Sequence, residues 1–163
     1  MQRENEKRES ALKNALAVMT RTNAAQTAQR ESQRILACNE QTAGRGLALT
    51  PAQAAALAQI RAESLRSTGR VEFGGGITPR LIGAFADSPY IEPGSYAETI
   101  GALTEIFYAY KNETMDAVSD GELLSAMRGF FDGACAGSTE LLAGREMPEY
   151  ARRIRAGGRN DAE

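Results

Sequence analysis

The chain has 163 residues, close to the size of one domain, and its composition excludes several classes of function. It has no histidine, so a Ser-His-Asp or Cys-His catalytic group cannot form within the chain and no imidazole can bind a metal. Its two cysteines, Cys38 and Cys135, belong to no CxxC or Cys/His cluster, which argues against a structural zinc site. We therefore expect no metal and no cofactor, and the lack of a catalytic motif favours a non-enzymatic protein.

The net charge of −2 conceals an uneven distribution along the chain. Residues 1–80 have a charge balance of +5, residues 81–149 one of −9, and residues 150–163 one of +2. The acidic stretch is typical of a solvated face, or alternatively of a surface that meets a basic partner or the basic half of a second copy. Basic residues are scattered and not interleaved with aromatic ones, so we expect no nucleic acid as a partner.

Compartment signals in the sequence predict a cytoplasmic protein. Two cysteines are low usage, which suits a reducing environment. The charged first ten residues are not followed by the apolar segment of a secretory signal. No run approaches the roughly 18 apolar residues of a membrane span, so we expect no membrane contact.

The first 46 residues are predicted to form a polar helical arm. Residues 1–22 have a thin apolar stripe, which fits either a helical face or a frayed extension. This stripe consists of Leu12, Leu16 and Met19. Residues 23–43 contain neither proline nor glycine and predict a second helix with a narrow apolar face. Glycines at 44 and 46 end it, and we place a compact helical domain at residues 47–163.

Cap and turn signals divide this domain into helices. Each predicted helix begins at a serine or threonine that can cap it, or at a proline in the first turn. The predicted helices run over 51–67, from Thr78 to before Asp87, from Ser95, from Ser119, over 138–144 and from Pro148. Nothing indicates a convincing pair of strands. The fold is predicted to be all-α, a compact bundle of six or seven helices with no substantial sheet.

A glycine run before the helix at Thr78 is the most site-like motif. Gly74, Gly75 and Gly76 let the backbone approach a ligand, and the free amides at the helix start favour an anion. Arg80 in the first turn adds a charged donor. The run lacks the Walker A ending and the GxGxxG spacing, so a tight connection between two helices explains the same glycines.

The turn that contains Asp87 and Tyr90 completes this candidate ligand site. Here Tyr90 would help to hold an anionic ligand, and the Asp87 carboxyl group is of a type that can act in acid–base chemistry. Alternatively, Asp87 caps a turn and Tyr90 packs on the core. No residue is assigned a catalytic role.

Several segments between Leu47 and about Arg155 resemble a small family of uncharacterised bacterial proteins, mostly from anaerobic Gram-positive lineages. These segments cover residues 49–51, 69–74, 84–91, 106–113 and 131–133. The run Asp87-Ser88-Pro89-Tyr90 is the most distinctive of them. The family is a domain of unknown function, so the resemblance implies a single helical unit and no activity.

Two hypotheses of different class follow for the function. The first is a non-enzymatic cytosolic helical protein that binds a protein partner or a second copy of itself through the arm and the acidic stretch. The alternative is a small-molecule binder or enzyme that holds an anionic ligand near Gly74–Arg80 and Asp87–Tyr90. A defined oligomer favours the first hypothesis, whereas ligand binding that depends on Arg80 and Tyr90 favours the second.

Overall fold

The computed structural model describes residues 1–72 and 74–160, and all regular structure in this part of the chain is helical. The elements in chain order are α1 (Gln2–Ala37), α2 (Asn39–Thr42), η1 (Ala43–Arg45), α3 (Pro51–Thr68), α4 (Thr78–Phe85), η2 (Pro93–Ser95), α5 (Tyr96–Glu113), α6 (Asp120–Asp132), α7 (Thr139–Leu141), η3 (Leu142–Glu146) and α8 (Met147–Asn160). Phe73, within one of the segments that carry the family resemblance, lies outside the described residues. No strand occurs in the described residues, and six of their helices have eight residues or more, which confirms the predicted all-α fold.

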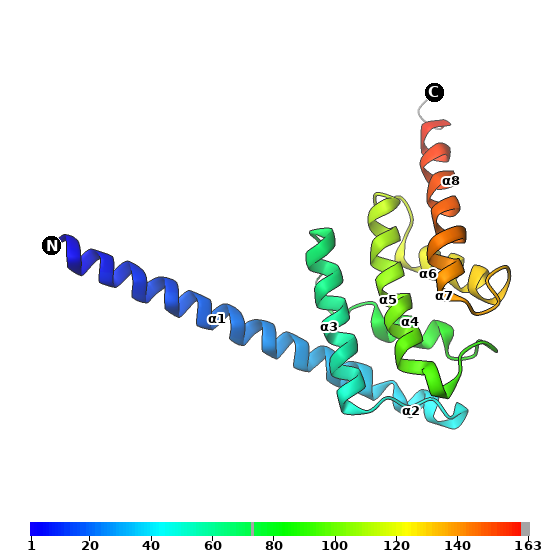
Figure 1. The fold of residues 1–163 in the computed structure, drawn as a ribbon, viewed down its shortest axis with the longest axis horizontal. Helices are drawn as coiled ribbons and strands as arrows, with labels where there is room; N and C mark the ends of the chain where they lie inside the picture. Colours follow the sequence, from blue (N-terminus) through cyan, green and yellow to red (C-terminus); the bar gives the residue numbers. More distant parts are fainter. Residues whose placement is uncertain (73, 161–163) are drawn as a thin grey trace.

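Helix α1 is one uninterrupted helix of 36 residues, where the sequence pattern predicted two. It contains no proline or glycine, so nothing breaks the backbone hydrogen bonds between the two predicted segments. Every side chain described in residues 1–27 is exposed, and burial begins with Ala28 and Glu31. We call residues 1–27 the projecting segment. At 1.5 Å per residue it extends about 40 Å from the body, residues 28–160 (Figure 1).

The body is organised around α3 and α5, which pack side by side (Figure 1). The C-terminal part of α1 packs against α3, while α4 and α6 contact each other and α5. The π-helical segment η3 joins α7 to α8 without a break, and both helices contact α5. This arrangement brings the end of α1, the connection after α3 and the middle of α5 to one corner of the body.

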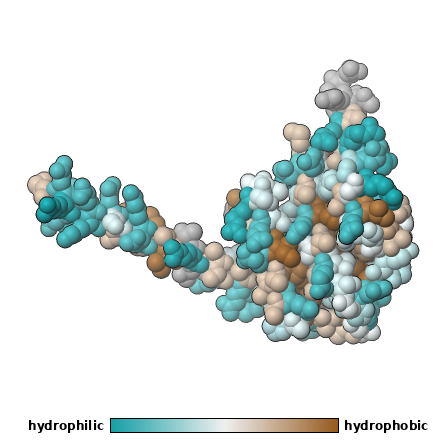
Figure 2. Space-filling view, viewed as in Figure 1, coloured by the Kyte–Doolittle hydropathy of each residue, from teal (hydrophilic) through white to brown (hydrophobic). Residues whose placement is uncertain are grey.

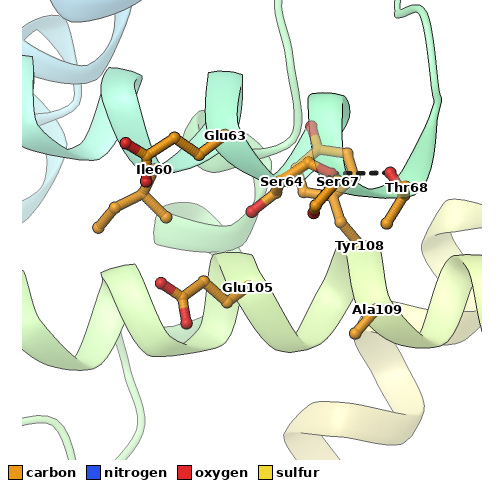
Figure 3. A pocket seen from close by; sticks show the side chains of 8 residues that line it. All are labelled: Ile60, Glu63, Ser64, Ser67, Thr68, Glu105, Tyr108 and Ala109. Atoms are coloured by element: carbon orange, nitrogen blue, oxygen red, sulfur yellow. Dashed lines mark hydrogen bonds between the residues drawn. The ribbon is translucent and has the colours of Figure 1, made fainter.

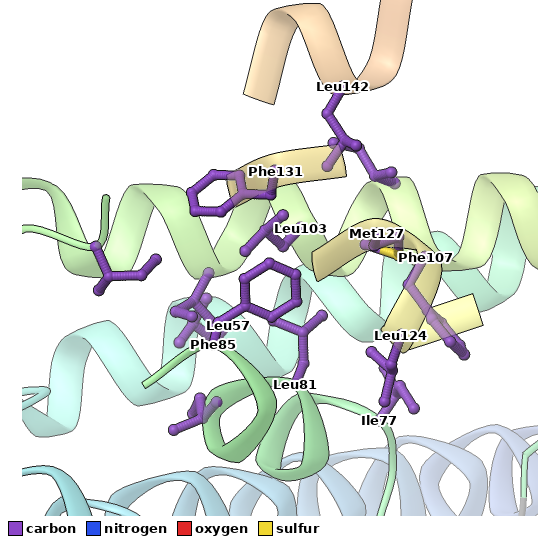
Figure 4. Packing of buried hydrophobic residues seen from close by; sticks show 14 of the residues in the cluster. Leu57, Ile77, Leu81, Phe85, Leu103, Phe107, Leu124, Met127, Phe131 and Leu142 are labelled. Carbon is purple, nitrogen blue, oxygen red and sulfur yellow. The ribbon is translucent and has the colours of Figure 1, made fainter. Parts of the chain in front are cut away.

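The core between these helices is aromatic and aliphatic (Figure 4). The rings of Phe85 on α4 and Phe131 on α6 meet edge to face, with centres 5.3 Å apart. Leu103 and Phe107 of α5 are also fully buried. Burying one side chain of this size contributes roughly 1.5–3 kcal/mol, so the core fixes the helices that carry the polar groups at this corner.

Helix α3 begins and ends as its sequence predicts. Thr50 Oγ1 accepts a hydrogen bond from the Gln53 amide at 3.1 Å, and Gln53 Oε1 accepts one from the Thr50 amide at 2.9 Å. Gly69 ends the helix in the left-handed conformation, at φ 65°. Helix α5 starts directly after Ser95, as predicted, but the Ser95 side chain makes no capping hydrogen bond, and a short 3₁₀ turn that begins at Pro93 leads into the helix.

Candidate functional site

Four polar side chains gather where α1, α3 and α5 meet, and we call them the buried cluster. They are Glu31 of α1, Arg61 of α3, Glu72 of the connection after α3, and Tyr108 of α5. Arg61 Nη2 donates to Glu72 Oε1 at 2.9 Å, and the Tyr108 hydroxyl donates to the same oxygen at 2.8 Å. Arg61 Nε also donates to the Tyr108 hydroxyl oxygen at 3.3 Å. Burial and the Glu72 contact raise the pKa of Tyr108, so its hydroxyl keeps the proton that it donates.

Helical spacing explains why charged groups of this cluster are buried. Glu31 lies four residues before Ile35, and Arg61 lies four residues after Leu57. Residues four apart share a helix face, so both charged residues lie on faces that pack into the body. Only 2% of Glu31 and 6% of Arg61 are exposed. A buried charge is costly unless it is paired, so the stability of the fold depends on the contacts that the cluster residues make with one another.

Glu31 is the least satisfied member of the cluster. Both of its carboxylate oxygens are buried, and neither has a hydrogen-bond partner among the described residues. The nearest cations, Arg61 Nη1 and Arg34 Nη1, each lie 3.9 Å from Glu31 Oε2, beyond the roughly 3.2 Å reach of a hydrogen bond. Burial raises the pKa of Glu31, and the two arginines lower it by less. A strong acceptor is thus held in place without a donor.

The substitution Glu31→Gln should make the stability of the protein less dependent on pH. A carboxyl group whose pKa is raised by folding stabilises the fold below its unfolded pKa, and this contribution is lost as the pH rises through the folded value. Glutamine does not titrate, so the variant should gain stability relative to the wild type as the pH rises from the unfolded pKa of glutamate, about 4.3, through the raised pKa of folded Glu31. Urea unfolding at a series of pH values measures this difference. Glu6→Gln, the same substitution at an exposed position of α1, serves as the control.

A cleft of about 250 Å³ opens beside the cluster, between α1 and the connection after α3. It is lined by Thr27, Arg30, Glu31, Arg34, Arg61, Glu72 and Gly74. Three arginines face two glutamates, so the lining has a formal charge of +1. Arg34 Nη1 donates to the Gly74 carbonyl oxygen at 3.1 Å and so ties the glycine run to α1. The cleft therefore combines cationic donors with a buried acceptor.

The predicted glycine run lies against the buried cluster. Gly76 has φ 74°, and a Cβ atom there would lie 2.6 Å from Glu31 Oε1 and 2.7 Å from Arg61 Nε. Only glycine allows the backbone to pass so close to these groups. By contrast, Gly75 has ample space, and Gly74 contributes the carbonyl that Arg34 binds.

Arg80 shares a second cleft with the glycines, whereas Thr78 does not line it. This cleft has a volume of about 230 Å³ and is lined by Glu72, Gly75, Gly76, Ile77, Arg80 and Asp120. Arg80 Nη1 lies 3.6 Å from Asp120 Oδ2, so an acidic side chain already pairs with this arginine. Thr78 is fully buried and does not cap α4, whose cap position is Ile77.

Asp87 and Tyr90 lie at the other end of α4. The helix has eight residues and separates them from the glycine run by about 12 Å. Asp87 Oδ1 accepts a hydrogen bond from Arg128 Nη1 at 2.7 Å, and this contact lowers the pKa of Asp87. Tyr90 packs edge to face on Phe131 and is 41% exposed. The structure thus brings Gly75, Gly76 and Arg80 together, but not with this pair.

Sequence reasoning did not find the buried cluster. Arg61 and Glu72 are 11 residues apart, and Arg61 and Tyr108 are 47 apart, so no local motif links them. The available signal was a charged residue at a core-facing position of a helix, as at Arg61 between the apolar residues Leu57 and Leu65. Such residues merit attention because a buried charge requires a partner.

The described residues hold no group of three or more cysteine or carboxylate side chains placed to share a metal ion. Cys38 and Cys135 are both free thiols. Burial raises the pKa of each, which disfavours the reactive thiolate. No helix in the described part of the chain has the length and apolar character needed to cross a bilayer.

Comparison with known proteins gives a family and no activity. No curated protein and no solved structure is significantly similar to this chain. The profile of a family of unknown function, DUF6323, matches residues 34–160, which is most of the chain and includes all the segments that carry the resemblance. It begins near the end of α1, and the division that we predict at residue 46 stays a prediction. The chain belongs to the family of unknown function DUF6323.

Proposed function

We propose that this protein is a non-enzymatic interaction protein that associates with a second copy of itself through the projecting segment. The observation that carries this proposal is the exposure of every side chain described in residues 1–27. Most of the stability of a protein helix comes from packing of an apolar face, and an isolated helix is only marginally stable in water. A helix of this length whose described side chains are all exposed is therefore best explained as one that packs on another chain.

The apolar residues of the projecting segment suit a helix partner. Leu12, Leu16 and Met19 are spaced by four and then three residues, as in the seam of a coiled coil. Their exposed fractions are 62%, 54% and 61%. In Figure 2 the segment is mostly hydrophilic with a small apolar patch. Such a thin seam suits a reversible association rather than an obligate one.

Charge favours a second copy as the partner. The projecting segment has five lysines and arginines against three glutamates, a balance of +2, whereas residues 81–149 have a balance of −9. A groove of about 290 Å³ runs between α3 and α5, and Glu63 and Glu105 line its two sides (Figure 3). Neither carboxylate forms an ion pair within the described residues. A basic helix from a second copy would supply the missing cations.

The oligomeric state tests this proposal. We expect analytical ultracentrifugation at an ionic strength of about 0.1 M to show a species of twice the chain mass. Raising the ionic strength to about 1 M shortens the Debye length from about 10 Å to about 3 Å and should shift the protein toward monomer. The variants Leu12→Glu and Met19→Glu should do the same at low salt, because each places a charge on the seam.

The matched control is Ala17→Glu, which adds the same charge on the other side of the helix. It should leave the association unchanged. A protein that is monomeric at every concentration and salt level tested contradicts the proposal. An oligomer that Leu12→Glu and Ala17→Glu weaken equally contradicts the role of the seam.

We infer further that the protein works in the bacterial cytoplasm. Its two free thiols support this location, because a reducing compartment keeps cysteines unpaired.

A further inference from the structure

We propose that the cleft beside Glu31 binds a small hydroxylated organic anion. Arg30 and Arg34 bind its acidic group, and the Glu31 carboxylate accepts a hydrogen bond from its hydroxyl. This binding does not depend on self-association through the projecting segment.

The cationic wall of the cleft has unused donors. Arg30 forms no ion pair within the described residues, and Arg34 uses only Nη1, toward the Gly74 carbonyl and, at 3.9 Å, toward Glu31. Both side chains lie at exposed positions of α1, four residues apart, and therefore project on the same side of the helix. Guanidinium groups bind carboxylates and phosphates through charge-assisted hydrogen bonds, often in pairs. The excess positive charge of the lining favours such an anion.

The buried acceptor sets the second requirement on the ligand. Glu31 is 2% exposed, lines the cleft, and has no donor for either carboxylate oxygen among the described residues. Nearly all buried polar groups in proteins have a hydrogen-bond partner. Arg61 binds Glu72 and Tyr108 through Nε and Nη2, and these bonds hold its Nη1 at 3.9 Å from Glu31 Oε2, outside hydrogen-bond distance. An ammonium group would be repelled by the arginines, so a neutral hydroxyl is the donor that fits.

Access and size restrict the ligand further. Gly76 lies directly against Glu31 Oε1, and because it has no side chain it leaves room beside the carboxylate that a larger residue would fill. The cleft volume of about 250 Å³ is below the roughly 300–1,000 Å³ of pockets for drug-sized molecules. A molecule the size of a three-carbon acid or phosphate suits this space.

Isothermal titration calorimetry on the full chain tests the proposal with glycerol 3-phosphate and glycerate. Propyl phosphate, propionate and glycerol serve as ligands that lack one of the two groups. We expect at least one hydroxylated anion to bind, its counterpart without hydroxyls to bind about ten-fold more weakly, and glycerol to give no signal. The preference between glycerol 3-phosphate and glycerate shows whether the cleft selects phosphate or carboxylate.

Variants assign the contacts. Arg30→Gln and Arg34→Gln should each weaken binding of the hydroxylated anion about ten-fold, whereas Arg21→Gln on the projecting segment should not. Glu31→Gln should reduce the preference for the hydroxylated anion over its counterpart, because it weakens the acceptor for the hydroxyl while removing the same charge for both ligands. Circular dichroism confirms that each variant is folded.

Three results would overturn the proposal. The first is that neither hydroxylated anion binds. The second is that each binds no better than its counterpart without hydroxyls, which would exclude Glu31 as the acceptor for a ligand hydroxyl. The third is binding that is insensitive to both Arg30→Gln and Arg34→Gln, which places the anion elsewhere.

Discussion

Replacing Arg61 with alanine is expected to destabilise the protein by about 3–5 kcal/mol, as removal of one partner from a buried ion pair commonly does. The change leaves Glu31 without its buried cation and removes both guanidinium hydrogen bonds to Glu72. The Tyr108 hydroxyl also loses a donor. Urea unfolding followed by circular dichroism measures the loss.

The control for this substitution is Arg66→Ala, on the same helix at an exposed position. It should change the free energy of unfolding by no more than about 0.5 kcal/mol. Adding Glu31→Gln to Arg61→Ala should recover part of the lost stability, because the double variant no longer buries the Glu31 charge without a cation. A loss that is as large for Arg66→Ala, or no recovery in the double variant, would mean that the buried cluster does not stabilise the fold through these contacts.

Gly76→Ala should be the most harmful of the three alanine substitutions in the glycine run. At φ 74° a residue with a Cβ atom costs roughly 1–2 kcal/mol in backbone strain. The new methyl group would also overlap Glu31 Oε1 and Arg61 Nε, and overpacking of this kind typically costs about 1–3 kcal/mol. The overlapped atoms end flexible side chains, but moving Arg61 breaks its hydrogen bonds to Glu72 and Tyr108.

Alanine substitutions at the two neighbouring glycines distinguish the cost of backbone strain from the cost of steric overlap. Gly74 also has a positive φ, of 94°, but nothing lies within 4 Å of its Cβ position, so Gly74→Ala suffers from strain alone. Gly75 has neither strain nor a close contact, and Gly75→Ala should be nearly neutral. Thermal and urea unfolding of the three variants should rank them in this order. If Gly76→Ala were no worse than Gly74→Ala, the backbone at Gly76 could not lie against the cluster.

Local signals predicted the helices well and the contacts between them poorly. Thr50 and Gln53 form the expected capping box because both partners lie within one turn. Ser95 occupies the predicted cap position of α5, but its side chain makes no capping hydrogen bond, because the 3₁₀ turn that begins at Pro93 holds Ser95 outside the extended conformation of a usual cap. Two helices were predicted in place of α1, since its polar middle lacks an apolar pattern although nothing in it ends a helix.

The candidate site was predicted in part. The glycine run was singled out for the freedom of its backbone, and Gly76 needs that freedom, but toward Glu31 and Arg61 rather than toward the start of α4. Glu31 and Arg61 come from separate helices, and sequence spacing within each helix does not tell which faces meet. Asp87 was grouped with the glycines because it is near them in sequence, yet α4 holds them apart.

The π-helical segment η3 determines which face of α8 turns toward the core. Leu142 and Met147 are five residues apart and both fully buried. On a regular α-helix five residues turn through about 500°, which would leave these side chains about 140° apart. The wider turn accommodates one extra residue and brings both to the core side. A one-residue insertion is thus absorbed within η3, and α8 keeps Ala151 facing the core instead of rotating it into solvent.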